Sequence, residues 1–222
     1  MQKNTVRVWD LPTRVFHWLL AVCIVALVAT AYIGGNAMAW HLRLGYAVLS
    51  LLLFRLVWGL VGGRWSRFGS FIYAPGTVLR YLKGQGKPEH SVGHTPLGAG
   101  SVFALLIFLA VQVGSGLMSD DEIAFSGPLT RFVSSETVEK ASWYHTQVGQ
   151  WIVIGLVVLH LAAILFYSWR KMGLVAPMVH GDKEIAHPVP SSRDDALSRI
   201  GAAVVLAVCV AGVTWLVNLG TP

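Results

Sequence analysis

Hydrophobic positions in this 222-residue chain gather into five long runs that polar segments separate. Each run holds about 20 residues, which is the length an α-helix needs to cross the hydrocarbon core of a bilayer. The first run is too long for the apolar core of a signal peptide, so we expect it to be retained as a helix. The five runs predict transmembrane helices at Val15–Ile33, Leu42–Val61, Leu97–Met118, Trp143–Trp169 and Ile200–Leu219.

Composition agrees with an all-α integral membrane protein. Hydrophobic residues make up 55% of the chain, and charged residues only 13%, about half the usual share. The net charge of +6 does not indicate nucleic-acid binding, because the basic residues flank the apolar runs. Cys23 and Cys209 lie inside apolar runs and form no CxxC or CxxCH motif, so neither a zinc site nor a covalently attached haem is indicated.

The distribution of Lys and Arg predicts the orientation in the membrane. Most of these residues fall in segments 1–14, 64–87 and 170–193, which the five spans place on one side. Only Arg43, Arg131 and Lys140 fall on the other side. Positively charged loops stay in the cytoplasm, so we expect a cytoplasmic N-terminus and a periplasmic C-terminus.

Two histidines lie in the fourth run, although ionisable side chains inside a membrane span are costly. His145 and His160 are 15 residues apart. On a regular α-helix this spacing gives about 22 Å of rise and about 60° of rotation, so both point broadly to one side at different depths. One metal ion cannot bridge them, whereas two stacked sites can.

The predicted orientation gives each of them a partner of equal depth. His17, at the start of the first helix, and His160, in the fourth, lie on the inner side. His41, at the start of the second helix, and His145, at the start of the fourth, lie on the outer side. Two such pairs suit two six-coordinate haems inside a helical bundle. Gly45 and Gly149 lie one turn beyond His41 and His145, where a flat porphyrin needs a position without a side chain.

Several sequence blocks carry a family resemblance. The segments "VRVWDLPTRVFHWLLA" (Val6–Ala21), "FRLVWGLVGGRWSRF" (Phe54–Phe68), "GHTPLGAGSVFALL" (Gly93–Leu106) and the fourth run resemble the prokaryotic cytochrome b561 family, which includes the cytochrome b subunits of nickel–iron hydrogenases. The resemblance covers about residues 6–180. The fifth run is similar to the variant that serves periplasmic c-type cytochromes.

The resemblance implies a four-helix transmembrane bundle with two non-covalent b-type haems and a fifth, C-terminal helix. Residues 1–180 would form the di-haem domain, and residues 181–222 an inner loop with the fifth helix. His17 and His160 would bind the inner haem iron, and His41 and His145 the outer one. The protein would then sit in a bacterial inner membrane and carry electrons between quinone and a periplasmic redox partner, for example a c-type cytochrome. Whether it forms a homo-oligomer, and whether it acts as an enzyme, stays open.

Further residues are candidates for contacts with these groups. Haem propionates need cations, for which Arg14, Arg55 and Arg64 are candidates at the inner haem and Arg43 at the outer one. Arg55 interrupts an apolar run, which fits either a propionate contact or snorkelling to the inner surface. His94 and Arg67 are candidates for a quinone site, or else solvated loop residues.

Other functions fit less well but are kept as alternatives. The chain could be a hydrogenase-type cytochrome b subunit, or a quinol oxidase that passes electrons to oxygen. A proton-coupled transporter could use histidines as relays, but it would show broken helices or acidic residues at mid-membrane. The five predicted spans contain no Pro, Asp or Glu. The acidic outer loop, with Asp120, Asp121 and Glu122, could dock a basic partner.

Overall fold

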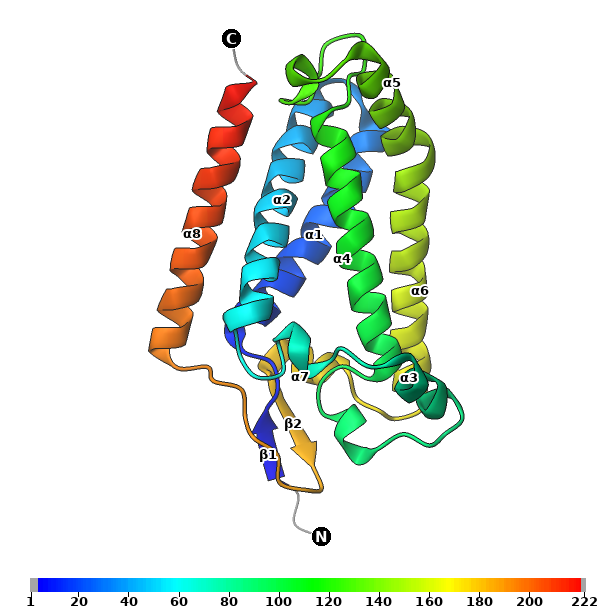
Figure 1. Ribbon diagram of the computed structural model, residues 1–222, viewed down its shortest axis with the longest axis vertical. Coiled ribbons are helices and arrows are strands. Elements are labelled where there is room, and N and C mark those ends of the chain that lie inside the picture. Colours follow the sequence, from blue (N-terminus) through cyan, green and yellow to red (C-terminus); the bar gives the residue numbers. More distant parts are fainter. Residues whose placement is uncertain (1–3, 221–222) are drawn as a thin grey trace. The chain divides into compact units, whose positions relative to one another are not determined.

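The computed structural model describes residues 4–220, and all five apolar runs form helices in it (Figure 1). The long helices are α1 (Leu11–Ile33), α2 (Met38–Val61), α4 (Pro96–Leu117), α6 (Gln150–Trp169) and α8 (Ala196–Leu219). Each is part of a helical segment long and apolar enough to cross a membrane. The prediction of a helical membrane protein with five spans is confirmed.

Shorter elements fill the connections between the long helices. They are the helices α3 (Pro75–Leu82), α5 (Ser135–Trp143) and α7 (Val175–His180), and the strands β1 (Asn4–Arg7) and β2 (Asp182–Ile185). The strands pair antiparallel, with Asn4 opposite Ile185 and Arg7 opposite Asp182 (Figure 1). The hydrophobic pattern predicted neither strand, because four residues in a polar segment carry too little periodicity.

Helix α1 begins earlier than its apolar run does, because a polar residue caps it. α1 begins at Leu11, directly after Asp10, whose Oδ1 accepts a hydrogen bond of 2.8 Å from the backbone N–H of Thr13. This is the bond that an N-cap residue makes to satisfy a free N–H of the first turn. Ser134 caps α5 in the same way, accepting from the Thr137 N–H at 3.3 Å.

The fourth span is not a regular α-helix. α5 continues into a π-helical segment, Tyr144–Gly149, which continues into α6. A π-helix winds more loosely than an α-helix, and such segments occur frequently at functional sites. The assumption of a regular α-helix between His145 and His160 was therefore wrong, and the rotation of about 60° does not apply across residues 144–149.

The chain divides into two compact units, which we describe separately. Unit 1 comprises Met1–Phe16, Arg55–Ala104 and Val158–Val205, and unit 2 comprises His17–Phe54, Leu105–Val157 and Leu206–Pro222. The predicted division at residue 180 stays a prediction.

Each unit has its own apolar core. In unit 1, the buried side chains of the β1–β2 sheet and its neighbours pack together: Val6, Val8, Trp9, Val92 and Ile185. In unit 2, the helices α2, α4 and α6 contribute Val48, Leu52, Leu109, Val113 and Val153. Most other apolar side chains of the spans are partly or fully exposed, as expected of helices that face lipid.

Candidate functional site

Two histidines face one another in unit 2. His41 lies in the first turn of α2, and His145 lies in the π-helical segment. Their ring centroids are 6.1 Å apart, and the ring planes stand nearly perpendicular, at 87°. The helices thus bring together the two residues whose sequence positions predict equal depth.

Backbone carbonyls orient both imidazole rings. His41 Nδ1 lies 3.0 Å from the Leu27 carbonyl oxygen, and His145 Nδ1 lies 2.9 Å from the Gln112 carbonyl oxygen. A carbonyl can only accept a hydrogen bond, so each Nδ1 carries the proton and donates it. The Nε2 atom of each ring then keeps its lone pair, which is the state a metal-binding histidine needs.

A cavity of about 460 Å³ surrounds this pair. Its walls come from α1, α2, α4 and the fourth span, and they are mostly apolar. This volume lies within the range of small-molecule and cofactor sites, about 300–1,000 Å³. Besides the two histidines, the walls include Ile24, Leu27, Gly45, Leu109, Val113, Gly116 and Val153.

The spacing of the two rings fits a haem iron between them. A bond from a metal ion to an imidazole nitrogen is roughly 2 Å long, and the nitrogen lies about 1 Å from the ring centre. Two rings on opposite sides of one iron therefore have centroids about 6 Å apart, and the structure has 6.1 Å. The apolar walls also suit a porphyrin, so these residues fit a bis-histidine haem.

Glycines and a glutamine shape the cavity, and two of them, Gly116 and Gln112, were not singled out from the sequence. A Cβ atom at Gly116 would lie 2.8 Å from the His145 ring, so only glycine leaves room for this ring. Gly45 lines the cavity, and a Cβ there would meet open space. Gly149 instead packs against the side chains of Gln112 and Tyr144. Gln112 also donates from Nε2 to the His145 carbonyl oxygen at 3.0 Å, which ties α4 to the π-helical segment.

Comparison with known proteins identifies the family of this chain. The family model described as prokaryotic cytochrome b561 matches residues 8–181. The chain belongs to the prokaryotic cytochrome b561 family. It is therefore a multi-pass membrane b-type cytochrome, and the predicted family is confirmed.

Curated relatives of this cytochrome are similar over most of their length. A probable Ni/Fe-hydrogenase B-type cytochrome subunit from Bradyrhizobium diazoefficiens is 23% identical, over 82% of this chain and 87% of that protein. The probable Ni/Fe-hydrogenase 1 B-type cytochrome subunit of Escherichia coli K12 is 23% identical, over 69% and 80%. A probable Ni/Fe-hydrogenase B-type cytochrome subunit from Cupriavidus necator is 24% identical, over 78% and 85%.

The other predicted ligands of the cytochrome lie in different units. His17 is the first residue of unit 2, and its ring meets the Trp18 ring edge to face at 5.1 Å between centroids. His160 lies in the part of α6 that belongs to unit 1. Their pairing at one iron stays a prediction.

The four arginines expected near propionates have different surroundings. Arg55 is only 2% exposed; its guanidinium lies 4.5 Å from the centre of the Phe68 ring, and its Nη1 has no hydrogen-bond partner among residues 4–220. Arg43 lies over the Trp40 ring at 5.1 Å. Arg14 donates to the Val179 carbonyl oxygen at 2.6 Å, and Arg64 is exposed. A buried guanidinium whose Nη1 lacks a hydrogen-bond partner in the described part of the chain suits an anionic group, so Arg55 is a candidate for a propionate contact.

Aromatic rings surround His94, one of the two residues considered for quinone. Its ring lies between those of Trp9 and Phe71, with centroid distances of 4.7 and 4.2 Å. The Tyr73 hydroxyl donates to the His94 carbonyl oxygen at 3.0 Å, and burial raises the pKa of Tyr73. Arg67 is exposed on the loop after α2. A quinone site at His94 and Arg67 stays a prediction.

A buried carboxylate, Asp10, joins the start of α1 to the end of α2 in unit 1. Besides Thr13, it accepts hydrogen bonds from Trp58 Nε1 at 3.2 Å, from Gly63 N at 3.0 Å and from Ser66 Oγ at 2.8 Å. Asp10 is fully buried, so these four donors satisfy a group that would otherwise be costly. The carboxylate fixes the first turn of the helix that carries His17.

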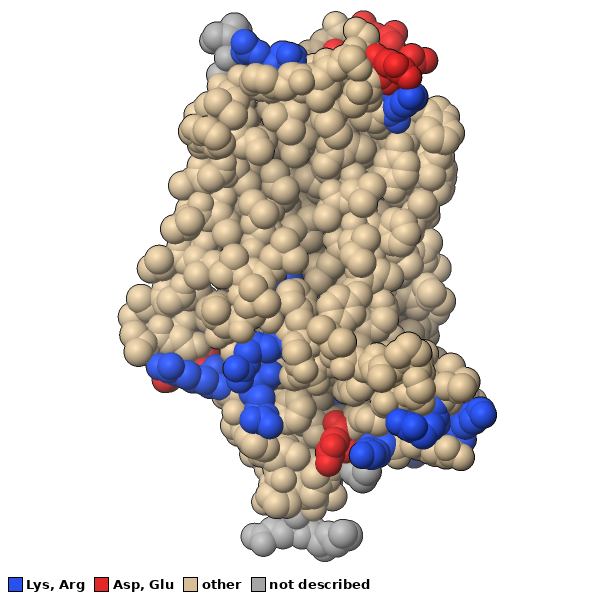
Figure 2. Space-filling model, in the orientation of Figure 1, with Lys and Arg blue, Asp and Glu red and all other residues tan. Residues whose placement is uncertain are grey.

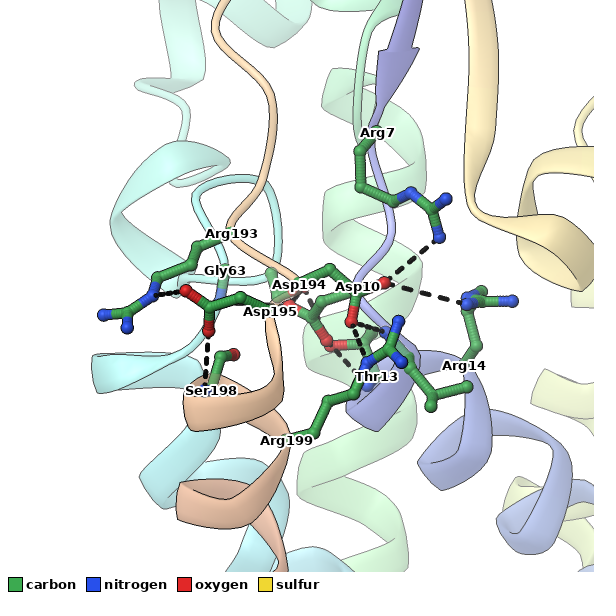
Figure 3. Close-up of polar contacts among 12 residues, drawn as sticks. Arg7, Asp10, Thr13, Arg14, Gly63, Arg193, Asp194, Asp195, Ser198 and Arg199 are labelled. Carbon is green, nitrogen blue, oxygen red and sulfur yellow. Dashed lines mark hydrogen bonds and ion pairs between the residues drawn. The ribbon is translucent and has the colours of Figure 1, made fainter.

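A second carboxylate, Asp194, gathers three arginines beside it (Figure 3). Arg7 approaches it at 3.1 Å, Arg199 at 3.0 Å and Arg14 at 3.9 Å. Burial acts to raise the pKa of Asp194, but the hydrogen bonds from Arg199 and from the Leu11 N–H, together with the arginine charges, outweigh it and lower the pKa. This network holds the segment before α8 against the start of α1.

Acidic side chains gather over the loop before α5 and on α5 itself (Figure 2). Asp121 Oδ1 accepts from the N–H groups of Ile123, Ala124 and Phe125, at 2.9–3.0 Å. These bonds lower the pKa of Asp121, so its charge persists below neutral pH. The loop thus presents a fixed negative surface to any partner of unit 2.

Proposed function

We propose that this cytochrome holds two b-type haems and carries electrons across the membrane between the quinone pool and a periplasmic redox partner. Haem supplies one-electron redox chemistry at its iron. In the proposal, His41 and His145 bind the outer haem, and His17 and His160 bind the inner one. Each pair would supply two imidazole nitrogens to its iron, which would then serve in electron transfer rather than in oxygen binding.

The observation that carries the proposal is the geometry of His41 and His145. Their rings face across an apolar cavity, and both Nδ1 protons are held by carbonyl oxygens. An ordinary buried histidine pair would hydrogen-bond through its free nitrogens, whereas these nitrogens are left for a metal ion.

The arginines have separate roles in the proposal. Arg55 contacts a propionate of the inner haem, and Arg43 a propionate of the outer one; for Arg14, Asp194 and the Val179 carbonyl already provide partners. The aromatic surroundings of His94 support a quinone ring near it. With the N-terminus in the cytoplasm, the acidic loop faces the periplasm and can receive a basic c-type cytochrome.

Reduction by quinol tests this function. The purified protein, oxidised and in detergent, is mixed with a short-chain quinol under argon, and the haem absorption is followed. We expect the quinol to reduce the haems, and an added basic c-type cytochrome to be reduced only when the protein is present. Haems that dithionite reduces but quinol does not would overturn the quinone role.

A second candidate function follows from the names of the relatives. They are described as hydrogenase cytochrome subunits, so the redox partner could be a hydrogenase. Co-purification of a tagged chain with its native partners separates the two candidates: a hydrogenase that co-purifies and donates electrons to the haems would replace the c-type cytochrome.

A further inference from the structure

A second cavity, of about 410 Å³, lies beside the last turn of α2 in unit 1. It extends to the 3-10 turn at Phe68–Ser70. Its walls combine two cations, a hydroxyl and two glycines: they are Gly59, Leu60, Arg64, Trp65, Arg67, Gly69 and Ser70. A Cβ atom at Gly69 would meet open space, so the cavity is roomy on this side.

The two arginines of this cavity have no carboxylate beside them. In the described part of the chain, neither Arg64 nor Arg67 forms an ion pair, whereas nearby arginines do. Lys and Arg side chains gather around the end of α2 and the start of α8 (Figure 2). The paired arginines are Arg7, Arg14 and Arg199, which share Asp194, and Arg193, which pairs with Asp195. Two guanidinium groups in one cavity without a counter-ion favour an external anion.

The loop that carries these arginines is held firmly from its buried side. Asp10 accepts from the Gly63 N–H and from the Ser66 hydroxyl. The Trp65 N–H donates to Ser192 Oγ at 3.2 Å, and its indole N–H donates to the Pro190 carbonyl oxygen at 2.9 Å. Ser66 is thereby buried while Arg64 and Arg67 are exposed, so the site is ordered before any ligand arrives.

Apolar side chains lie next to the cations. Leu60 and Val61 are 71% and 65% exposed, and Leu56, one turn earlier, is 53% exposed. These residues form the end of a predicted span, where hydrocarbon gives way to headgroups. A free inorganic anion would contact the arginines alone. A lipid would contact the arginines with its headgroup and the apolar side chains with its acyl chains.

We propose that this cavity binds the phosphate headgroup of an anionic phospholipid, with the acyl chains along Leu56, Leu60 and Val61. Arg64 and Arg67 donate to the phosphate oxygens, while the Ser70 hydroxyl, which donates to the Arg67 carbonyl oxygen at 2.6 Å, lines the cavity. This assignment is independent of the di-haem proposal, and it gives Arg64 and Arg67 a ligand other than a propionate or a quinone. Basic pockets of transmembrane helices on the cytoplasmic side are suited to such headgroups.

Lipid retention tests the proposal. The haem-loaded protein is purified in a mild detergent, delipidated, and mixed with equal amounts of phosphatidylglycerol and phosphatidylcholine; native mass spectrometry then counts the bound lipids. We expect the wild type to retain phosphatidylglycerol preferentially. The double variant Arg64→Gln/Arg67→Gln should weaken its retention about fivefold for each arginine, roughly 25-fold in all.

Three further measurements test whether the binding is specific to this cavity and to a lipid. The control variant Arg80→Gln/Lys83→Gln removes two exposed charges at the C-terminal end of α3 in the same unit, and it should keep the preference. Ser70→Asp, which adds a negative charge inside the cavity, should lose it. Inorganic phosphate at the lipid concentration should not raise the melting temperature of the wild type, whereas phosphatidylglycerol should.

Each opposite result overturns the proposal. Equal retention of both lipids by the wild type, or full retention by the double variant, would show that the arginines do not select the headgroup. Equal loss in the α3 control would reveal only a general charge effect. Stabilisation by inorganic phosphate equal to that by the lipid would identify a free-anion site.

Discussion

The Asp10 carboxylate offers the sharpest test of how unit 1 is held together. Asp10→Asn keeps the size and shape of the side chain but replaces one oxygen by an NH₂ group. Each oxygen of Asp10 accepts from two donors: Oδ1 from Thr13 N and Trp58 Nε1, and Oδ2 from Gly63 N and Ser66 Oγ. The new NH₂ group must therefore face two donors, wherever it is placed.

The cost follows from those contacts. A hydrogen bond to a charged group contributes about 1.5–3 kcal/mol, so two lost bonds set an upper bound of about 3–6 kcal/mol. The amide nitrogen is best placed on the Oδ2 side, because the Ser66 hydroxyl can rotate and accept there, whereas the Thr13 and Trp58 N–H groups can only donate. We therefore expect a loss of about 2–4 kcal/mol, which lowers the melting temperature by about 5–10 °C.

Thermal unfolding in detergent measures this loss, at one fixed scan rate because membrane proteins often unfold irreversibly. Asp182→Asn is the matched control, since Asp182 is 36% exposed and pairs with Arg7 at 2.8 Å. The control should lose less than about 1 kcal/mol, as exposed ion pairs do. A melting temperature of Asp10→Asn equal to that of the control would refute the reasoning.

Three other predictions concern separate features. Asp194→Asn should destabilise the protein at pH 7 by about 1–3 kcal/mol. Because the pKa of Asp194 is lowered in the folded protein, the difference in stability between variant and wild type should vanish as the pH falls from the unfolded pKa, about 3.9, through the folded pKa. A constant difference in stability down to pH 3 would contradict this. Ser115→Ala removes a hydroxyl that donates to the Gln112 carbonyl at 2.8 Å and lies 3.2 Å from His145 Nδ1, so it changes the hydrogen bonding of the His145 N–H. The midpoint potential of one haem should shift by roughly 20 mV in a redox titration, and an unchanged potential counts against the orientation of His145. Reversing the charges of Asp120 and Asp121 should slow electron exchange with a basic c-type cytochrome and flatten its salt dependence in stopped-flow measurements, whereas identical kinetics would exclude docking at this loop.

The membrane spans were predictable because their signal is local. A run of about 20 apolar residues without Pro, Asp or Glu has few alternatives to a spanning helix. The starts of the helices were less predictable, since polar caps such as Asp10 lie outside the apolar runs. The sequence "DLPT" signals an N-cap, but nothing in it indicates that Trp58, Gly63 and Ser66 bond the same carboxylate.

The candidate site was predictable only in its histidines. The juxtaposition of His41 and His145 followed from orientation and depth, which Lys and Arg in the loops indicate. The π-helical segment has no sequence signature, and its looser winding depends on packing such as that of Gln112 against Gly149. Gly116 could have been singled out only with knowledge of which side of α4 faces His145. The β1–β2 pairing joins the N-terminal segment to the segment between α7 and α8, which local patterns do not reveal.

The most direct test of the central claim is a haem count on the purified protein and on His145→Ala. Pyridine haemochrome quantification of the wild type should give two b-type haems per chain, with sharp low-spin bands after reduction by dithionite. His145→Ala should retain one such haem, because the cavity beside His41 loses one axial ligand while the pair of His17 and His160 is left intact. A wild type with fewer than two haems, or a variant that keeps two low-spin haems, would contradict the account.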